Sequence, residues 1–210
     1  MHALVFAAGE PPSRELAAAL HERADLVVAA DSGADRALAL GITPDVVVGD
    51  LDSLSGAARA RIPADRLLED AIGDRTDLEK AVAFAIDRGA TAIEIACAGG
   101  GRADHALGNL SVLRTFRGRA QIALIDDLFA TRLVGDTERI DAAPGTVISL
   151  VALGACAGVT TSGLRWDLSD ATLTFGTLGI HNEVAKAPAS IRVASGDLVL
   201  FEGRWVEHHR

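Results

Sequence analysis

The sequence lacks the two glycine-rich motifs that most often identify a nucleotide-binding domain. Neither G-x-x-x-x-G-K-[ST] nor G-x-G-x-x-G occurs anywhere in its 210 residues, so it gives no support to a P-loop kinase or to a dinucleotide-binding unit. Cysteine is almost absent as well. Cys97 and Cys156 lie far apart and provide neither a disulfide framework nor the ligand spacing of a zinc site. A phosphate-binding site would have to be built from other residues.

Basic residues and long apolar runs are also scarce. The formal net charge is -9, and nucleic-acid-binding surfaces usually carry an excess of Lys and Arg, so we expect no nucleic-acid partner. Every window of about twenty residues is broken by charged or turn residues, which predicts a globular chain without a membrane span. The apolar start "HALVFAAGEPP" is short, has no basic leader and ends in a turn, which indicates a first strand rather than a signal peptide. We therefore expect a cytoplasmic protein.

The first part of the chain alternates apolar runs rich in Val, Ile and Ala with amphipathic stretches. This alternation is typical of βαβ units around a parallel sheet. The apolar runs predict strands at residues 3–8, 25–30, 45–49, 91–97 and 120–126, and the stretches between them predict helices at 12–23, 33–41, 76–90 and 104–116. Residues 1–132 are therefore expected to form an α/β domain, a Rossmann-like parallel sheet with flanking helices.

The character of the sequence changes from about residue 136. Short β-type runs such as "TVISLVAL", "GVTTSGLRW", "SIRVAS" and "LVLFEG" are separated by Gly, Ser, Asp and Pro. Short strands with such turn residues between them predict a small sandwich or barrel. We place the boundary near residues 130–137 and expect residues 137–210 to form an all-β domain.

Acidic residues stand where predicted strands end. Asp31 follows "LVVAA", Asp50 and Asp52 follow "VVVG", and Asp126 and Asp127 follow "IALI". In open α/β sheets, ligands bind outside the carboxyl ends of the strands. A D-x-D pair there can hold Mg²⁺, which takes one or two carboxylates and fills its other positions with water and phosphate oxygens. The alternative is that Asp52 and Ser53 cap the next helix.

A second cluster, "GDRTDLEKA", spaces Asp74, Asp77 and Lys80 in steps of three. Asp77 and Lys80 then share one helix face, and Asp74 stands just before the helix. Thr76 and Glu79 have the spacing of a capping box. Lys80 is one of only two lysines in the sequence, which has eighteen arginines. It either serves a position that needs an ammonium group or is a surface partner of Asp77.

A third cluster, "GGGRADHALGNL", places three glycines between a predicted strand and a helix. Glycines at such a junction let backbone N–H groups approach an anion at the helix N-terminus. Arg102 can reach phosphate with its planar guanidinium. Asp104 has the alternative role of N-cap, while His105 and Asn109 are four residues apart and share one helix face near the loop.

Taken together, the ordered stretches "AADSGADRALALGITPDVVVGDLDSLS", "DRTDLEKAV" and "GGGRADHALGNLSVL" resemble the thiamine pyrophosphokinase family. The resemblance covers about the first 115 residues and continues more weakly through "TSGLRWDL" and "LGIHNEV". It implies transfer of the pyrophosphoryl group of ATP to the hydroxyl of thiamine, with Mg²⁺ as cofactor. It also implies a homodimer in which thiamine binds between the α/β domain of one subunit and the β domain of the other.

The resemblance also implies roles for particular residues. The catalytic, metal-binding acids would be Asp50, Asp52, Asp74 and Asp77. The ATP-binding residues would be Asp31, Lys80, Arg102, Asp104, His105 and Asn109. The thiamine-binding residues would be Trp166, His181 and Asn182.

Trp166 suits thiamine because an aromatic face attracts a cationic thiazolium ring. Its alternative role is that of a core residue of the β domain, as is common for large aromatic side chains.

The chain departs from the family pattern at two positions: Ser32 stands where the family often has glycine, and His181 stands where a serine commonly precedes the asparagine.

Two other functions fit the same acidic residues. A metal-dependent nucleotide pyrophosphohydrolase would use water as the acceptor, and a nucleotide-sensing module would bind Mg-ATP without turnover. The β domain with Trp166 argues against both, because it offers a wall for a second substrate.

Overall fold

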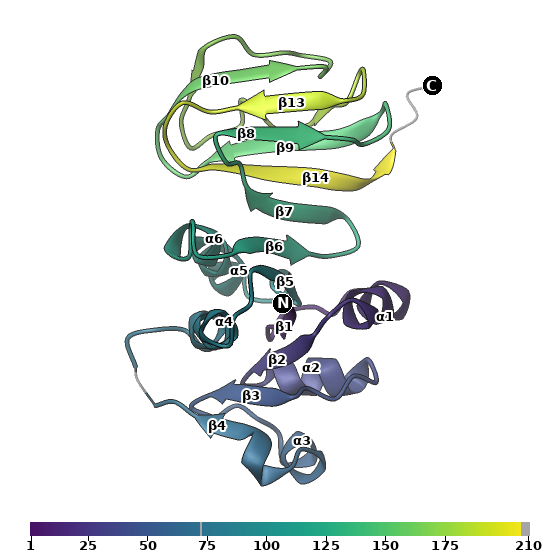
Figure 1. The fold of residues 1–210 in the computed structure, drawn as a ribbon, viewed down its shortest axis with the longest axis vertical. Coiled ribbons are helices and arrows are strands. Elements are labelled where there is room, and N and C mark those ends of the chain that lie inside the picture. The colour runs from purple at the N-terminus through teal and green to yellow at the C-terminus, as the bar shows by residue number, and fades with distance from the viewer. Residues whose placement is uncertain (72, 207–210) are drawn as a thin grey trace. The chain divides into compact units, whose positions relative to one another are not determined.

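The structure, a computed structural model, describes residues 1–71 and 73–206. Contacts divide it into two compact units, Met1–Asp127 and a second unit from Leu128 onward (Figure 1). Each unit is built from the kind of elements that the sequence pattern predicts, helices with strands in the first and strands alone in the second.

The first unit has a parallel sheet of six strands. In order across the sheet these are β6 (Gln121–Ile125), β5 (Ala92–Ala96), β1 (His2–Phe6), β2 (Leu26–Ala30), β3 (Val46–Gly49) and β4 (Leu67–Glu69), and each neighbouring pair is parallel. The five predicted strands are confirmed. The short β4 was not predicted, because its three residues are mostly exposed and carry no long apolar run.

Helices flank this sheet. They are α1 (Arg14–Glu22), α2 (Gly33–Ala39), α3 (Gly56–Arg61), α4 (Asp77–Asp87), α5 (Ala103–Asn109) and α6 (Ser111–Thr115), with a 3-10 turn at Ala64–Arg66. Figure 1 shows α1, α2 and α3 on one side of the strands and α4 on the other. The helix predicted at 104–116 is divided into α5 and α6. The 3-10 turn was not predicted, and α3 was expected only as the helix that Asp52 and Ser53 could cap.

The order of the strands creates a place for a ligand. From β1 the chain adds β2, β3 and β4 on one side and then crosses over to add β5 and β6 on the other. The loops after β1 and β5 therefore leave the sheet in opposite directions, which opens a crevice at the carboxyl ends of these strands. Buried apolar side chains such as Leu4, Phe6 and Ile95 fix the strands below that crevice.

The second unit contains two antiparallel sets of strands. One set runs in the order β12 (Asn182–Glu183), β9 (Thr146–Ala152), β14 (Leu198–Val206) and β7 (Phe129–Leu133). The other runs β11 (Ala171–Leu173), β10 (Cys156–Ser162), β13 (Ala189–Arg192) and β8 (Thr137–Ile140). A single apolar cluster takes residues from both sets, including Ile148 and Leu200 from the first and Val159 and Ile191 from the second.

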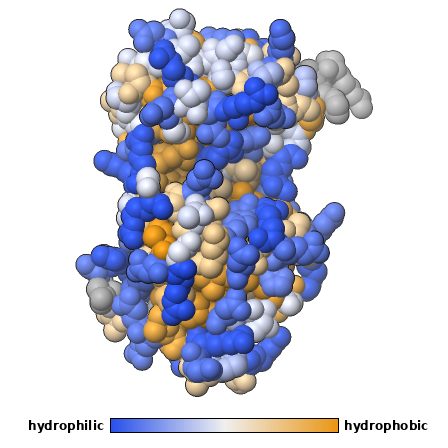
Figure 2. All heavy atoms as spheres, viewed as in Figure 1, coloured by the Kyte–Doolittle hydropathy of each residue, from blue (hydrophilic) through white to orange (hydrophobic). Residues whose placement is uncertain are grey.

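Among the described residues, no helix is both long and apolar enough to cross a bilayer. On the face drawn in Figure 2, hydrophilic residues cover much of each unit, and hydrophobic residues are visible between them.

Candidate active site

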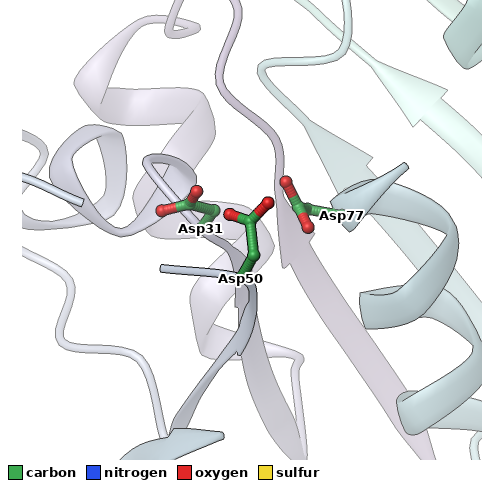
Figure 3. A group of neighbouring side chains, drawn as sticks. All are labelled: Asp31, Asp50 and Asp77. Carbon is green, nitrogen blue, oxygen red and sulfur yellow. The ribbon is translucent and has the colours of Figure 1, made fainter. Parts of the chain in front are cut away.

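Three carboxylates converge at the carboxyl ends of the parallel strands. Asp31 follows β2, Asp50 follows β3 and Asp77 is the first residue of α4. One oxygen from each of these side chains lies within 4.8 Å of the others. Figure 3 shows the three side chains next to one another, with Asp50 between Asp31 and Asp77. We call Asp31, Asp50 and Asp77 the acidic trio.

Gly49, the last residue of β3, makes this convergence possible. A Cβ atom at Gly49 would lie 3.0 Å from the Cβ of Asp31 and 3.1 Å from the Cγ of Asp77. Both distances are closer than ordinary packing allows, so a side chain here would push the carboxylates apart. The glycine directly before Asp50 therefore lets the other two acids close around it.

Asp31 is the buried member of the trio. It is 3% exposed, and its Oδ1 atom has no hydrogen-bond partner among the described residues, while Oδ2 accepts a hydrogen bond from the Ser53 N–H at 3.2 Å. Burial raises the pKa of Asp31 to about 6, and the charges of Asp77, Asp50 and Asp52 add to this rise against the Ser53 hydrogen bond. A buried carboxylate oxygen without a donor is costly unless a cation satisfies it.

Lys80 is hydrogen-bonded to Asp77, one member of the trio. The side chain is buried, at 6% exposed, and its Nζ donates to the Asp70 carbonyl at 2.8 Å and to Asp77 Oδ1 at 3.0 Å. Burial by itself would lower the pKa of the ammonium group, but the hydrogen bond to Asp77 and the charges of Asp77, Asp70 and Asp50 raise it overall. Lys80 is therefore a buried cation that fixes Asp77, and its description as a surface partner is wrong.

The capping box before Asp77 is confirmed. Thr76 caps α4 by accepting from the Glu79 N–H at 3.3 Å, and the Glu79 side chain accepts from the Thr76 N–H at 3.3 Å. This reciprocal pair fixes where α4 starts, and so it fixes the position of Asp77 in its first turn.

Two predicted metal ligands are not part of the trio. Asp52 is exposed, and its Oδ1 accepts from the Ser53 hydroxyl at 2.8 Å. Asp74 is exposed in the turn before α4. Between Asp50 and Asp52, Leu51 has a φ of 62°, a strained conformation. Among the described residues, the group of three acids that lie close together includes Asp50 but not Asp52.

The alternative role for Asp52 and Ser53, capping the next helix, is wrong. That helix is α3, and its N-cap is Ser55, whose hydroxyl accepts from the Ala58 N–H at 3.0 Å. Ser53 instead uses its N–H on Asp31. This contact between Ser53 and the buried acid was not predicted.

Two loops form one wall of the crevice. The loop after β1 is hydrogen-bonded to the loop after β5, with Gly9 N–H donating to the Cys97 carbonyl at 2.7 Å and Glu10 N–H donating to the Gly99 carbonyl at 2.8 Å. A Cβ atom at Gly9 would lie 2.2 Å from the Gly99 oxygen, so only glycine fits at this crossing. In the predicted triglycine loop, Gly100 has a φ of 73°, a backbone conformation that glycine adopts without strain.

Asp127, one of the strand-end acids after β6, has a structural role at this end of the sheet. Its two carboxylate oxygens accept from the N–H and the hydroxyl of Ser13, at 2.7 and 2.6 Å. Ser13 in turn caps α1. Asp127 therefore anchors the start of α1 and is not part of the acidic trio.

A cavity of about 510 Å³ lies between these loops and the trio. Its lining includes many predicted site residues and several that were not predicted. The predicted ones are Asp31, Asp77, Arg102, His105 and Asn109, and the others include Glu10, Ser32, Arg36, Ser53 and Thr76. His105 and Asn109 thus share the face of α5 that the spacing predicts. The volume suits a small-molecule ligand.

Arg102 and Asp104 are paired with each other. Nε and Nη2 of Arg102 donate to the two carboxylate oxygens of Asp104 at 3.1 and 2.5 Å, and the Arg102 side chain is 73% exposed. The hydrogen bond from Arg102 lowers the pKa of Asp104 to about 2. Asp104 is not the N-cap of α5, because Arg102 holds that position and no side chain caps the helix. Asn109 secures the helix by donating to the Ala98 carbonyl at 2.8 Å.

Ser32, which stands where the family often has glycine, does not need a backbone conformation that only glycine can adopt. Ser32 has φ −63° and ψ −5° at the start of α2, an ordinary helical conformation that any residue adopts. His181, the second departure, has a φ of 64°, and its N–H donates to the Ser149 hydroxyl at 3.0 Å.

In the second unit, Trp166 is 55% exposed, so its alternative role as a core residue is wrong. The Arg165 guanidinium lies over the indole ring, 4.9 Å from its centroid, and pairs with Glu183 at 2.6 Å. Asn182 bonds to the Trp166 backbone. The three predicted thiamine-binding residues are therefore adjacent, with Asn182 and His181 consecutive and Asn182 in contact with Trp166.

The sequence matches two family models. Residues 17–125 match "Thiamin pyrophosphokinase, catalytic domain", and residues 137–198 match "Thiamin pyrophosphokinase, vitamin B1 binding domain". The first match lies within the first structural unit, and the second lies within the second unit.

The chain is also similar to individual thiamine pyrophosphokinases and to a solved structure of one. Thiamine pyrophosphokinase 1 of Arabidopsis thaliana is 31% identical over 210 residues, which cover 86% of this chain and 78% of the relative. Thiamine pyrophosphokinase of Bacillus subtilis (strain 168) is 30% identical over 185 residues, covering 84% and 86%. A crystal structure of thiamine pyrophosphokinase from Bacillus subtilis superimposes with a TM-score of 0.84 at 26% identity, over 97% of this chain and 99% of that chain.

Proposed function

The chain belongs to the thiamine pyrophosphokinase family, and we propose that the acidic trio and the adjoining cavity form its active site. The enzyme transfers the pyrophosphoryl group of ATP to thiamine, which gives thiamine diphosphate and AMP. This reaction is a transfer, not the hydrolysis or the nucleotide sensing that the acidic residues alone left open. The observation that carries the proposal is the convergence of three carboxylates beside a cavity that has a glycine-rich wall.

The trio fits a Mg²⁺ ion. Asp31, Asp50 and Asp77 offer hard oxygen ligands within 4.8 Å of one another, and in the part of the chain that the structure describes no donor bonds to the buried Oδ1 of Asp31. Mg²⁺ binds such carboxylates and completes its shell with water and phosphate oxygens. When bound, it would supply positive charge that neutralises the polyphosphate. Asp52 and Asp74 remain proposed catalytic acids, and the charge of Asp52 is felt at Asp31.

The remaining residues position the nucleotide. We propose that Arg102, His105 and Asn109 line the ATP site, since all three line the cavity, and that Asp104 holds the guanidinium of Arg102. Lys80 keeps Asp77 in place by its buried hydrogen bond. Phosphoryl-type transfer depends mainly on positioning and charge neutralisation, so these residues suffice without a covalent intermediate.

In the reaction, the hydroxyl oxygen of thiamine forms a bond to the β-phosphorus of ATP. The bond from that phosphorus to the oxygen that bridges to the α-phosphate breaks, and AMP leaves with the electron pair. The hydroxyl proton passes to an aspartate of the site or to a phosphate oxygen.

The second unit is the proposed thiamine site, and the protein is a proposed homodimer. A thiazolium cation over the exposed indole of Trp166 gains cation–π attraction, and Asn182 and His181 complete this site. Exposed apolar side chains gather in the same part of the sequence, at Trp166, Phe175, Leu178 and Ile180, and such side chains often mark an interface. We propose that the thiamine site is shared between the Rossmann-like domain of one subunit and the β-sandwich domain of the other.

The test is to incubate the purified protein with ATP, Mg²⁺ and thiamine and to identify the products. We expect AMP and thiamine diphosphate to appear in equal amounts. AMP formed at the same rate without thiamine would contradict the transfer reaction. Binding of ATP with no turnover in any mixture would contradict catalysis itself.

A further inference from the structure

Two arginines line the cavity of the first unit, and they differ in what holds them. Arg102 uses Nε and Nη2 on the carboxylate of Asp104 and is 73% exposed. Arg36, which stands one turn into α2, donates from Nε to the Ala8 carbonyl at 3.2 Å. Within residues 1–71 and 73–206, no hydrogen bond or ion pair engages the terminal nitrogens of Arg36.

The backbone that carries Arg36 is fixed in place. The helix α2 begins at Gly33, where a Cβ atom would lie 2.1 Å from the Phe6 carbonyl oxygen. The start of α2 therefore packs directly on the end of β1, and Arg36 follows one turn later on the same face. Asp31, the buried acid of the trio, lies just before this helix and lines the same cavity.

In this arrangement the terminal nitrogens of Arg36, which lines the cavity, are available to bind a ligand. The Ala8 carbonyl accepts a hydrogen bond from Nε of this exposed residue, and Nη1 and Nη2 keep their donors for a ligand. A planar guanidinium with paired N–H groups matches the spacing of two phosphate oxygens. Apart from Arg36 and Arg102, the charged side chains that line the cavity are acidic: Glu10, Asp31 and Asp77.

We propose that Arg36 is a phosphate-binding residue of the nucleotide site, donating from Nη1 and Nη2 to phosphate oxygens of ATP. The inference rests on the proposed function, because it takes the cavity as the ATP site. In this proposal Arg36 makes the main contact with the phosphates. Arg102 contributes less to phosphate binding because it is already paired with Asp104. The sequence carries no local signal for this role, since Arg36 is one of eighteen arginines in the chain.

The experiment compares ATP binding with adenosine binding by isothermal titration calorimetry in Mg²⁺, with adenosine measured by its competition with ATP. Arg36→Ala should weaken ATP binding about tenfold or more, because a hydrogen bond between charged groups is lost, and should leave adenosine binding unchanged. Arg36→Lys should weaken ATP binding less, since it keeps the charge without the fork. Arg102→Ala should have a smaller effect than Arg36→Ala.

Arg14→Ala is the matched control. Arg14 also donates to a main-chain carbonyl, that of Ala39 at 2.9 Å, but it does not line the cavity. Its loss should leave ATP and adenosine binding unchanged. Circular dichroism checks that each variant is folded, and Arg36→Lys replaces Arg36→Ala if the alanine variant does not fold.

The possible outcomes separate this inference from the proposed function. Wild-type protein that binds no ATP overturns the proposed function. Wild-type protein that binds ATP, with Arg36→Ala and Arg36→Lys binding it equally well, overturns only the role of Arg36. An equal loss of ATP and adenosine affinity would also overturn it, because Arg36 would then only hold the Ala8 loop.

Discussion

The side-chain amide of Asn182 hydrogen-bonds to both main-chain polar groups of Trp166. Its Oδ1 accepts from the Trp166 N–H at 3.2 Å, and its Nδ2 donates to the Trp166 carbonyl at 2.8 Å. Arg165, held by Glu183, lies over the indole ring. One asparagine thus fixes the backbone of the exposed tryptophan, and one arginine occupies a position over its ring.

This relationship predicts that Asn182 acts on thiamine through Trp166. Trp166→Leu should raise the KM for thiamine about tenfold, the value of one cation–π contact, with little change in the KM for ATP. Asn182→Ala should shift the same constant in the same direction, because the tryptophan loses its anchor. Steady-state kinetics with each substrate varied in turn measures both. A rise in the KM for ATP alone would contradict the assignment.

The two aspartates that follow β3 are expected to be needed for turnover. Asp50→Asn should keep the fold but lose most turnover, since an amide keeps the shape of the side chain and removes the charge that binds Mg²⁺. From sequence, Asp52→Asn is expected to do the same, although Asp52 lies outside the trio. Rates at limiting Mg²⁺, with circular dichroism as the check on folding, compare the two. Near-normal activity of either variant would reject its aspartate as a ligand.

Buried Lys80 predicts an effect on stability. Lys80→Met should lower the free energy of unfolding by about 2 kcal/mol or more, because the Asp70 carbonyl and Asp77 lose a buried charged donor. Urea denaturation at neutral pH measures this difference. Lys186→Met is the control, since Lys186 is the second lysine of the chain and is exposed. Equal stability of the two variants would show that the buried ammonium contributes nothing.

The two thiols should be unreactive in the folded protein. Cys97 is 2% exposed, and burial raises the pKa of its thiol from 9.0 to about 12; Cys156 is also buried. Ellman's reagent at pH 8 should label neither thiol in buffer and both in urea. Above pH 9 the unfolded chain loses the Cys97 proton while the folded chain keeps it, so this group makes the free energy of unfolding fall as the pH rises. Rapid labelling without denaturant would contradict this.

A shared thiamine site predicts complementation between inactive variants. A mixture of Asp50→Asn protein with Trp166→Ala protein should recover part of the activity, because a mixed dimer then carries one intact site. Subunit exchange is verified with differently tagged chains. Mixed dimers that form and stay inactive would place each thiamine site within one subunit.

The sequence by itself determined the elements whose signals are local. Five apolar runs predicted five buried strands because both faces of a parallel sheet are covered. The Thr76–Glu79 capping box fixed the start of α4 because its hydrogen bonds join residues three apart. The three ordered motifs pointed to the family for a related reason: each is a continuous stretch of chain that carries its own residue types and spacing.

Only the tertiary structure decided which of these residues meet. Asp31, Asp50 and Asp77 come from the ends of two strands and the start of a helix, and they converge because parallel pairing aligns those ends and Gly49 leaves room. Asp52, two residues from Asp50, does not join them. The hydrogen bond from Arg36 to the Ala8 carbonyl and those between Asn182 and Trp166 likewise join residues distant in sequence. Such contacts depend on how the elements pack, and they leave no periodic signal in the chain.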